Sequence, residues 1–329
     1  MVSNIHKCQW KTSYSMVVLK HLDLIIIGAG TAGLTAALYG ARSGLRTLVL
    51  EERIIGGSAA ETPIIENYPG FYEGISGREL VDRMAKHCKK FGAEINELES
   101  VTKMTFKDSM ATVKTEKATY TSSVVIIASG CHYKELGVPG EAEFRGRGVS
   151  YCTLCDGAFF KEKKVIVVGG GNTAAISSIY LANLASVVMV AHRRDQLRAE
   201  EALVKDMRSQ NVDILWNTEV KEIKGDTKVK SVILHNNKTG KKREVDIDGV
   251  FIQVGEVPNS QVAKKAGVEV DKDGYILVDS RQRTNIEGLY AAGDITKGPV
   301  KQIGTAVGQS IIAATEAFGH IKQPYYYQR

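Results

Sequence analysis

Two cysteines separated by two residues, Cys152 and Cys155, are the clearest sign of chemistry in the sequence, and Asp156 follows them directly. Two thiols at this spacing can close a small, readily reduced disulfide, and neighbouring charges can lower the pKa of a thiol. A carboxyl group beside them could carry the proton that is exchanged when the disulfide opens and closes. The sequence therefore predicts a redox-active dithiol with Asp156 as its acid–base group.

Other interpretations of the pair are half of a zinc site or structural cysteines. A zinc site would need two more ligands from Cys8, Cys88, Cys131 or the histidines, and the chain has no second pair of cysteines at this spacing. Cys131 follows a predicted strand and is interpreted as structural. Five scattered cysteines do not form the framework of a secreted scaffold, so we expect a reducing, cytoplasmic location.

A strand, a glycine-rich turn, a helix and a second strand occur twice, over residues 24–51 and again over residues 165–192. The cysteine pair lies between these two units. Continuous apolar strands that flank a helix are typical of parallel strands buried on both faces of a sheet. The sequence therefore predicts an α/β protein with two Rossmann-like domains.

Further apolar segments extend this pattern. Strands are expected within residues 94–107, 111–115, 124–127, 212–216, 229–235 and 250–255. A strand over residues 288–294 and a helix from about 300 to 318 end the chain, and together they would deliver Asp294 to a ligand. The alternative for Asp294 is an ordinary Gly–Asp turn.

The glycine turns could bind dinucleotides or could only connect strand to helix. In a binding turn the first glycine permits the tight bend, the second admits the pyrophosphate, and the third lets helix and strand pack closely. Free N–H groups at the start of the helix then hold the phosphates. The complete strand–turn–helix–strand context favours binding, through Gly28, Gly30 and Gly33 in the first unit and Gly169, Gly171, Asn172, Thr173 and Ala174 in the second.

The residue that ends the second strand of each unit distinguishes the two ligands. Glu51 ends the first, and a carboxylate there suits ribose hydroxyls and repels an added phosphate, as FAD requires. The second ends in His192, Arg193 and Arg194, with Arg198 close by, and guanidinium groups suit the 2′-phosphate of NADPH. A solvated basic run is the alternative interpretation of these arginines.

From Leu22 to about Phe318 the chain resembles the low-molecular-weight thioredoxin reductases. The motifs that carry the resemblance lie at residues 28–30, 66–70, 146–150, 152–157, 169–174, 192–195, 258–259 and 291–294. The resemblance implies a three-layer ββα architecture in which an NADPH domain, residues 136–256, is inserted into an FAD domain, residues 22–135 and 257–329. It adds Gly57, Asn67, Gly130 and Gln302 to the FAD contacts.

The resemblance also implies a mechanism. Electrons would pass from NADPH to FAD, then to the disulfide, and then to thioredoxin or a thioredoxin- or glutaredoxin-like protein. Cys155 would face the flavin, Cys152 would attack the partner, and the molecule would be a homodimer. The NADPH domain would swivel about hinges near residues 134–140 and 254–258.

Three departures from the family pattern involve four residues. Ile176 and Ser177 stand where acidic residues are common, Lys301 replaces an arginine ahead of Gln302, and Ser58 replaces a glutamine. Two other functions remain open: a thiol-independent NADP reductase that serves ferredoxin or flavodoxin, and a redox-sensing flavoprotein without turnover. The cysteine pair favours disulfide reduction over both.

Bulk properties exclude some classes of protein. The 43 basic and 37 acidic residues are dispersed, so we expect no nucleic-acid binding, and no apolar run reaches the ~20 residues of a membrane helix. Residues 1–21 lack the apolar stretch and cleavage site of a signal peptide, and are expected to be a flexible extension. Met16, just ahead of the first strand, could be an alternative translation start.

Overall fold

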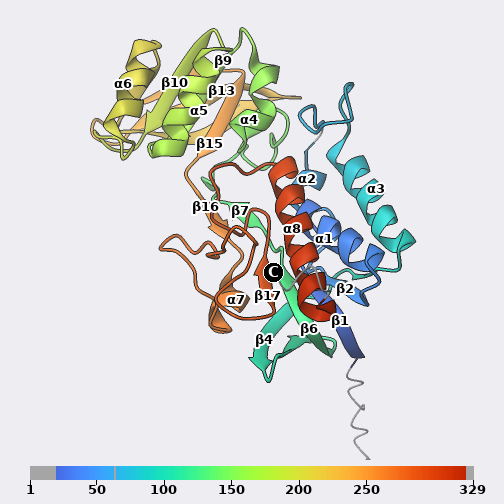
Figure 1. The fold of residues 1–329 in the computed structure, drawn as a ribbon. Helices are drawn as coiled ribbons and strands as arrows, with labels where there is room; N and C mark the ends of the chain where they lie inside the picture. Colours follow the sequence, from blue (N-terminus) through green and yellow to red (C-terminus); the bar gives the residue numbers. More distant parts are fainter. Residues whose placement is uncertain (1–19, 63, 324–329) are drawn as a thin grey trace, which may run out of the picture.

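The computed structural model describes residues 20–62 and 64–323. It contains a seven-stranded mixed sheet in one domain and a five-stranded parallel sheet in a second, and a short two-stranded ribbon joins the two domains (Figure 1). The expected N-terminal extension, with Met16, lies outside the described residues up to residue 19, whereas Lys20 and His21 already belong to the first strand.

The domain that contains both described ends of the chain, here called the outer domain, is built on a mixed sheet with five parallel strands. Its strands are short and almost entirely apolar, so that Leu24, Ile25 and Ile26 are fully buried. In spatial order they are β3 (Glu94–Asn96), β2 (Thr47–Leu50), β1 (Lys20–Ile27), β6 (Thr119–Ile127) and β17 (Leu289–Ala291). Strand β17 thus pairs with a strand that precedes it by about half the length of the chain.

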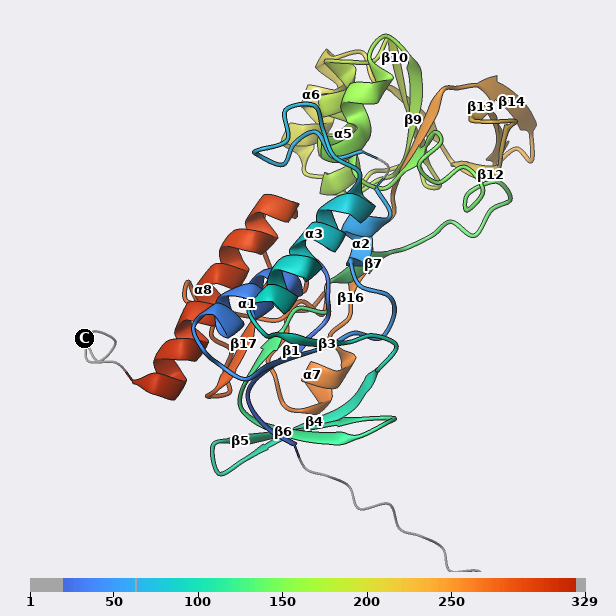
Figure 2. The same ribbon diagram turned by 90° about the vertical axis from the view of Figure 1, so that its right-hand side faces the viewer.

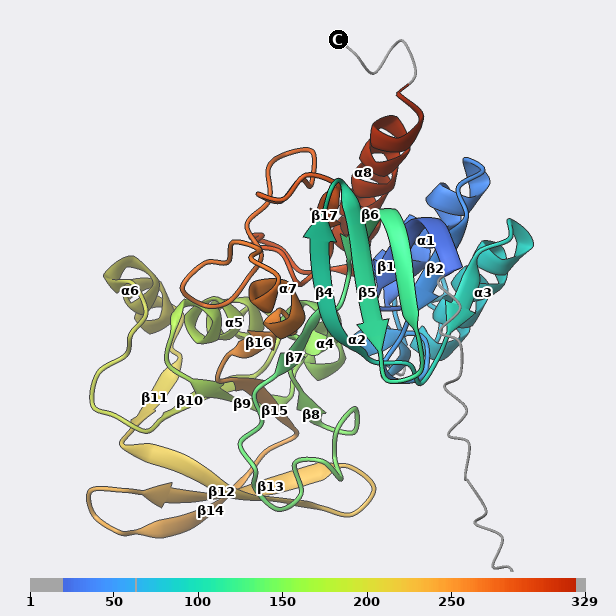
Figure 3. The same ribbon diagram turned by 90° about the horizontal axis from the view of Figure 1, so that it is seen from below.

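Helices cover one face of the parallel strands, and two antiparallel strands that extend the sheet from β6 pack against the other. Helices α1 (Thr31–Arg42), α3 (Gly77–Lys90) and α8 (Ile303–Lys322) lie side by side (Figure 2). Alanines on α1 and α8 let these two helices approach closely. On the opposite face lie β4 (Val101–Lys107), β5 (Met110–Thr115) and α7 (Gln261–Lys265) (Figure 3). A short helix, α2 (Gly57–Ala60), precedes α3.

The middle domain repeats this plan. Its parallel sheet has the order β11 (Asp213–Trp216), β10 (Val187–His192), β9 (Lys164–Gly169), β15 (Gly249–Gln253) and β8 (Val149–Ser150). Helices α5 (Asn172–Ala182) and α6 (Glu201–Ser209) pack on one face. The antiparallel strands β12 (Thr218–Gly225), β13 (Val229–Asn236) and β14 (Lys242–Asp246) pack on the other.

Two short strands carry the chain between the domains. Strand β7 (Cys131–Tyr133) leaves the outer domain, and β16 (Glu256–Pro258) returns to it, paired antiparallel with β7. The cysteine pair lies beyond β8, at the start of the short helix α4 (Thr153–Asp156), which a 3₁₀ turn, η1 (Gly157–Phe160), extends.

The predicted fold class is confirmed: the protein is α/β, with two Rossmann-like ββα domains, one inserted in the other. Two element predictions need correction. Residues 94–107 form two strands rather than one segment, because the backbone turns at Leu98, whose φ is 55°. The last helix begins at Ile303 and ends at Lys322, later at both ends than expected.

Candidate active site

Cys152 and Cys155 are joined in a disulfide whose Cα atoms are 5.3 Å apart. Both side chains are partly buried. The backbone N–H of Cys155 donates to Cys152 Sγ at 3.2 Å, which fixes the turn between them. No cluster of residues that could hold a metal occurs within residues 20–62 and 64–323, so this part of the chain offers no support for the zinc alternative.

Asp156 lies at the end of the same turn, with its carboxyl group held by Ser150. The Ser150 hydroxyl donates to Asp156 Oδ2 at 2.6 Å and accepts from the backbone N–H of Cys152 at 3.1 Å. Burial raises the pKa of Asp156 above its usual value, and the hydrogen bond from Ser150 opposes this rise. A carboxyl group that keeps its proton to higher pH is suited to proton exchange with a thiol.

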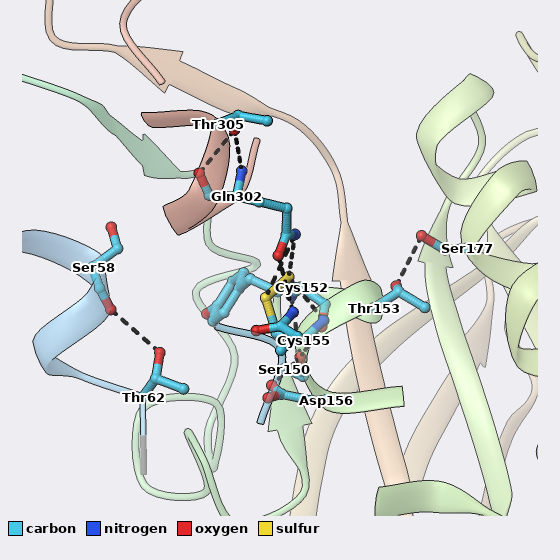
Figure 4. Close-up of a disulfide and its surroundings, with 12 residues drawn as sticks. Ser58, Thr62, Ser150, Cys152, Thr153, Cys155, Asp156, Ser177, Gln302 and Thr305 are labelled. Carbon is cyan, nitrogen blue, oxygen red and sulfur yellow. Dashed lines mark hydrogen bonds between the residues drawn. A yellow bond between two sulfur atoms is a disulfide. The ribbon is translucent and has the colours of Figure 1, made fainter. Parts of the chain in front are cut away.

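The redox turn is fastened to the helix that begins at the second glycine motif. Thr153, between the two cysteines, donates from Oγ1 to Ser177 Oγ on α5 at 2.8 Å (Figure 4). The Gln253 side chain at the end of β15 donates to the carbonyl of Tyr151 at 3.2 Å. Ser177, one of the departures from the family pattern, therefore has a definite role in holding this turn.

A cavity of about 1430 Å³ reaches from the first glycine turn to the disulfide. Its lining brings together residues that the sequence placed far apart. From the predicted sites it includes Gly28, Gly30, Glu51, Gly57, Asn67, Gly130, Asp294, Gln302, Cys152, Cys155 and Asp156. The size and the lining of the cavity fit an extended dinucleotide whose reactive end meets the disulfide.

The first glycine turn has no room for a side chain at Gly28 or Gly33, whereas Gly30 leaves open space where a pyrophosphate would approach. A Cβ on Gly33 would lie 1.8 Å from the carbonyl oxygen of Gly28, and one on Gly28, whose φ is 103°, would lie 2.5 Å from that of Ala128. Gly30 caps α1, and its missing side chain leaves open space. Free N–H groups at the start of α1 therefore face the cavity, as phosphate binding requires.

Two carboxylates line the same cavity. Glu51 accepts the backbone N–H of Ala29 at 2.6 Å and that of Arg53 at 2.8 Å, so its orientation is fixed at the end of β2. Burial raises the pKa of Asp294, and among the described residues no hydrogen bond to its carboxylate is found. A partly buried carboxylate without a donor fits a ligand that brings hydroxyl groups, such as the ribityl chain of FAD.

The second glycine turn is equally crowded. A Cβ on Gly169 would lie 2.4 Å from the carbonyl oxygen of Gln253, and Gly171 caps α5 with open space beside it. Asn172 exchanges two hydrogen bonds with Glu200, at 2.7 and 2.9 Å, which bind the start of α5 to the loop before α6. Ala174 is buried against the turn, whereas Thr173 is exposed at the first turn of the helix.

Arg193, Arg194 and Arg198 are all exposed on the loop after β10. No ion pair to their guanidinium groups is found in the part of the chain that the structure describes. The backbone N–H of Arg198 donates to the carbonyl of Gly170 at 2.7 Å, which ties the arginine loop to the glycine turn. Three guanidinium groups thus stand beside the helix start where a dinucleotide phosphate would bind.

His192 differs from its predicted role as a direct contact. Its ring is buried, with Nδ1 2.9 Å from the carbonyl oxygen of Gly169 and Nε2 2.9 Å from that of Gln196. Both ring nitrogens are therefore occupied by the backbone of the protein. We assign His192 to support of the glycine turn and the arginine loop rather than to the ligand.

The two described free cysteines have no sign of reactivity. Burial raises the pKa of both Cys88 and Cys131 to about 12, so neither forms a thiolate at neutral pH. Cys131 lies 3.4 Å from the ammonium group of Lys301, which makes a 2.5 Å ion pair with Glu256 on β16. The interpretation of Cys131 as structural agrees with these contacts.

Sequence reasoning missed Ser150, Gln253 and the pairing of Thr153 with Ser177. Hydroxyl and amide side chains carry no spacing signal, and their partners lie 24 to 102 positions away in the chain. Only the Ser150–Asp156 contact is local enough to have been suspected from the sequence. Among the described residues no helix is both long and apolar enough to span a membrane.

Fold and site together define an oxidoreductase that binds two dinucleotides and carries a redox-active disulfide. The family model described as pyridine nucleotide-disulphide oxidoreductase matches residues 22–310. The chain therefore belongs to this family, and within it to the low-molecular-weight thioredoxin reductases.

The relatives make the assignment more specific. Thioredoxin reductase from Bacillus subtilis is 45% identical over 306 residues, which cover 92% of this chain and 96% of that protein. A solved structure of thioredoxin reductase from Streptococcus pyogenes is 42% identical, with a TM-score of 0.88 and coverage of 92% and 99%. One from Lactococcus lactis, described as the FR conformation, is 40% identical with coverage of 92% and 100%, but its TM-score is 0.63.

Proposed function

We propose that the chain is an NADPH-dependent thioredoxin-disulfide reductase that passes electrons through FAD and the Cys152–Cys155 pair. The observation that carries this proposal is the disulfide at the end of a cavity that fits FAD. When bound, FAD accepts two electrons from NADPH and delivers them to the disulfide. The predicted domain boundary at residues 135/136 falls just after β7 and the one at 256/257 falls within β16, and both are kept as part of the proposal.

The residues of the redox turn carry out the thiol chemistry. The Cys152 thiol gives its proton to Asp156 while its Sγ attacks one sulfur of the partner's disulfide and forms a bond to it; the partner's other sulfur leaves and takes that proton from Asp156. Cys155 Sγ, as a thiolate, then attacks Cys152 Sγ and restores the internal disulfide, and the partner's second sulfur leaves as a thiolate that takes a proton from water. Asp156 is suited to this exchange because burial raises its pKa while Ser150 holds its carboxyl group beside the turn.

Asp156 can exchange protons without opening the large cavity. It also lines a second cavity of about 300 Å³, bounded by Phe159, Phe160 and Lys163 among others. Protons can therefore reach the carboxyl group from the side of the middle domain while the disulfide remains at the large cavity.

We propose that the middle domain rotates during turnover, because the disulfide and the nucleotide turn of that domain cannot both meet the flavin in one arrangement. The ribbon of β7 and β16 connects the two domains, next to the predicted hinges at residues 134–140 and 254–258. Two relatives of nearly equal identity, 42% and 40%, have TM-scores of 0.88 and 0.63, which supports two arrangements of similar domains. The ion pair between Arg145 and Glu61, 2.8 Å long, joins the domains and would have to break.

The test is an assay on the purified protein. Its flavin spectrum is recorded, NADPH is added without oxygen, and oxidised thioredoxin is then offered as the acceptor. Cys152→Ser should abolish thioredoxin reduction while NADPH still reduces the flavin. Unchanged thioredoxin reduction in that variant would contradict the dithiol mechanism and favour a thiol-independent reductase.

The family resemblance further supports a homodimer, with thioredoxin or a thioredoxin- or glutaredoxin-like protein as partner, and a cytoplasmic location. Sedimentation of the flavin-loaded protein measures the oligomeric state, and a single species with the mass of one chain would contradict the dimer. Comparison of kcat/KM for thioredoxin and glutaredoxin-like acceptors identifies the preferred partner.

A further inference from the structure

The side-chain amide of Gln302 faces both sulfurs of the disulfide. Its Nε2 atom lies 4.0 Å from Cys152 Sγ and 4.0 Å from Cys155 Sγ (Figure 4). Gln302 belongs to the outer domain, where it caps the N-terminus of α8, whereas the cysteines belong to the middle domain. One amide nitrogen carries two hydrogens and is therefore able to serve either sulfur.

The orientation of this amide is fixed from the other side. Asn67 donates from Nδ2 to Gln302 Oε1 at 3.0 Å, so the oxygen of the amide points away from the disulfide and the nitrogen points toward it. The backbone N–H of Gln302 donates to Thr305 Oγ1 at 3.0 Å, which holds the main chain at the start of α8. Both the main chain and the side chain of Gln302 are thus held in place.

The two sulfurs differ in their other hydrogen-bond donors. Cys152 Sγ accepts the backbone N–H of Cys155 at 3.2 Å. Cys155 Sγ has Gln302 as its one donor within residues 20–62 and 64–323. A thiolate in a partly buried position is unfavourable unless hydrogen bonds replace its lost water, so a donor at this position matters most when Cys155 becomes charged.

We propose that Gln302 is a catalytic residue, whose amide donates a hydrogen bond to the thiolate that forms when the disulfide is reduced. The inference rests on the proposed function and deepens it. Two electrons from NADPH, delivered through FAD, break the S–S bond; one sulfur becomes a thiol by taking a proton from Asp156, and the other becomes a thiolate. The hydrogen bond from Gln302 stabilises that thiolate until it is protonated or reacts.

Charged groups in the same cavity could also act on the sulfurs. Asp156 lies on the redox turn itself, and Asp294, Glu61, Lys301 and Arg145 line the walls, along with Glu51, Glu52, Arg53, Arg78, Glu99, His132, Lys134 and Glu135. The two basic groups Lys301 and Arg145 are already paired with carboxylates. Lys301 pairs with Glu256 at 2.5 Å, and Arg145 pairs with Glu61 at 2.8 Å. The amide of Gln302 is the side-chain donor that directly contacts the sulfurs.

The test measures the thiols without using turnover. Flavin-loaded protein is reduced with dithiothreitol and alkylated with iodoacetamide across a range of pH, and mass spectrometry follows Cys152 and Cys155 separately. For Gln302→Leu, loss of one charge-assisted hydrogen bond should move the alkylation midpoint of Cys155 up by about one pH unit. The dithiol–disulfide equilibrium in glutathione buffers should shift toward the disulfide by about tenfold, which corresponds to about 30 mV for this two-electron couple.

Two further variants separate electrostatics from structure. Gln302→Glu keeps the size of the side chain but brings a negative charge to the sulfurs, and should shift both measurements further than Gln302→Leu does. Ser310→Ala changes a buried side chain of α8 whose hydroxyl contacts only the helix backbone at Ala306, and it should leave the alkylation midpoint of Cys155 unchanged.

The outcomes are distinct. Alkylation profiles of Gln302→Leu and Gln302→Glu that coincide with that of the wild type would overturn the role of Gln302, even if NADPH still reduces the disulfide. An equal shift in Ser310→Ala would also overturn it, since the effect would then come from a general change in α8. Failure of NADPH to reduce the wild-type disulfide would instead contradict the proposed function, and the alkylation result would still decide the role of the amide.

Discussion

Replacing Arg193 and Arg194 together by alanine should cost the enzyme its preference for NADPH over NADH. Both side chains are exposed beside the second glycine turn, and their backbone carbonyls are held by Asn237 and Asn217. The loop therefore keeps its shape when the guanidinium groups are removed. NADH lacks the 2′-phosphate, so its binding should change little.

The size of the effect follows from the exposure of the two side chains. A hydrogen bond to a charged group contributes about 1.5–3 kcal/mol, but exposed ion pairs contribute closer to about 1 kcal/mol. Loss of two such contacts to a doubly charged phosphate should cost about 2–3 kcal/mol. At 1.36 kcal/mol for each factor of ten, KM for NADPH should rise roughly 30- to 150-fold.

The assay is anaerobic reduction of the bound flavin with each nicotinamide, followed by stopped-flow absorbance. Arg208→Ala is the matched control, because Arg208 is an exposed arginine at the end of α6 in the same domain. It removes one positive charge away from the glycine turn and should change neither KM. Equal losses for NADPH and NADH in the double variant, or no loss for either, would refute the assignment of these arginines to the 2′-phosphate.

Three further predictions concern the redox turn, the flavin cavity and stability. Ser150→Ala removes the hydrogen bond that lowers the pKa of Asp156 against the effect of burial, so this pKa should rise. The alkaline limit of thioredoxin reduction should then move to higher pH. An unchanged pH–rate profile would exclude this contact from the mechanism. Gly33→Ala brings a Cβ to 1.8 Å from the Gly28 carbonyl oxygen and should lower the flavin content measured by absorbance. The control Gly308→Ala adds a Cβ that meets no atom within 4 Å and should keep the flavin content of the wild type. Equal flavin content in the two variants would contradict the close packing at Gly33. Glu316→Gln weakens the contacts of a buried carboxylate with Arg281 and Arg283. Since both arginines are partly exposed, the free energy of unfolding should fall by about 1–2 kcal/mol and the melting temperature by a few degrees. An unchanged melting temperature, measured by circular dichroism, would contradict this prediction.

The fold could be predicted where the sequence repeats a local pattern. The two strand–turn–helix–strand units are confirmed because continuous apolar strands and glycine turns are encoded within about 30 residues of each other. Helix α3 and strands β12 and β14 were missed. The buried residues of α3, Leu80, Val81, Ala85 and Cys88, recur at helical spacing and could have revealed this helix, whereas β14, Lys242–Asp246, is almost wholly exposed and has no apolar pattern.

Site residues could be predicted from the sequence where the position allows one residue type for one physical reason. Glycines that must not carry a Cβ and the paired cysteines are of this kind. His192 is the instructive exception, because a ring at the end of a strand can turn inward to the backbone as readily as outward to a ligand. The contact of Gln302 with Asn67, 235 positions away, depends on how the two chain segments of the outer domain come together and has no local signal.

The position of β17 has a consequence for synthesis of the protein on the ribosome. Its pairing partner β6 is complete at Ile127, but β17 itself ends at Ala291, and α8, which covers the same sheet, ends at Lys322. The first half of the outer domain must therefore wait, with apolar surface exposed, while the whole middle domain emerges and can fold on its own. We therefore expect chaperones to bind, and misfolding to begin, while the sheet of the outer domain is still incomplete.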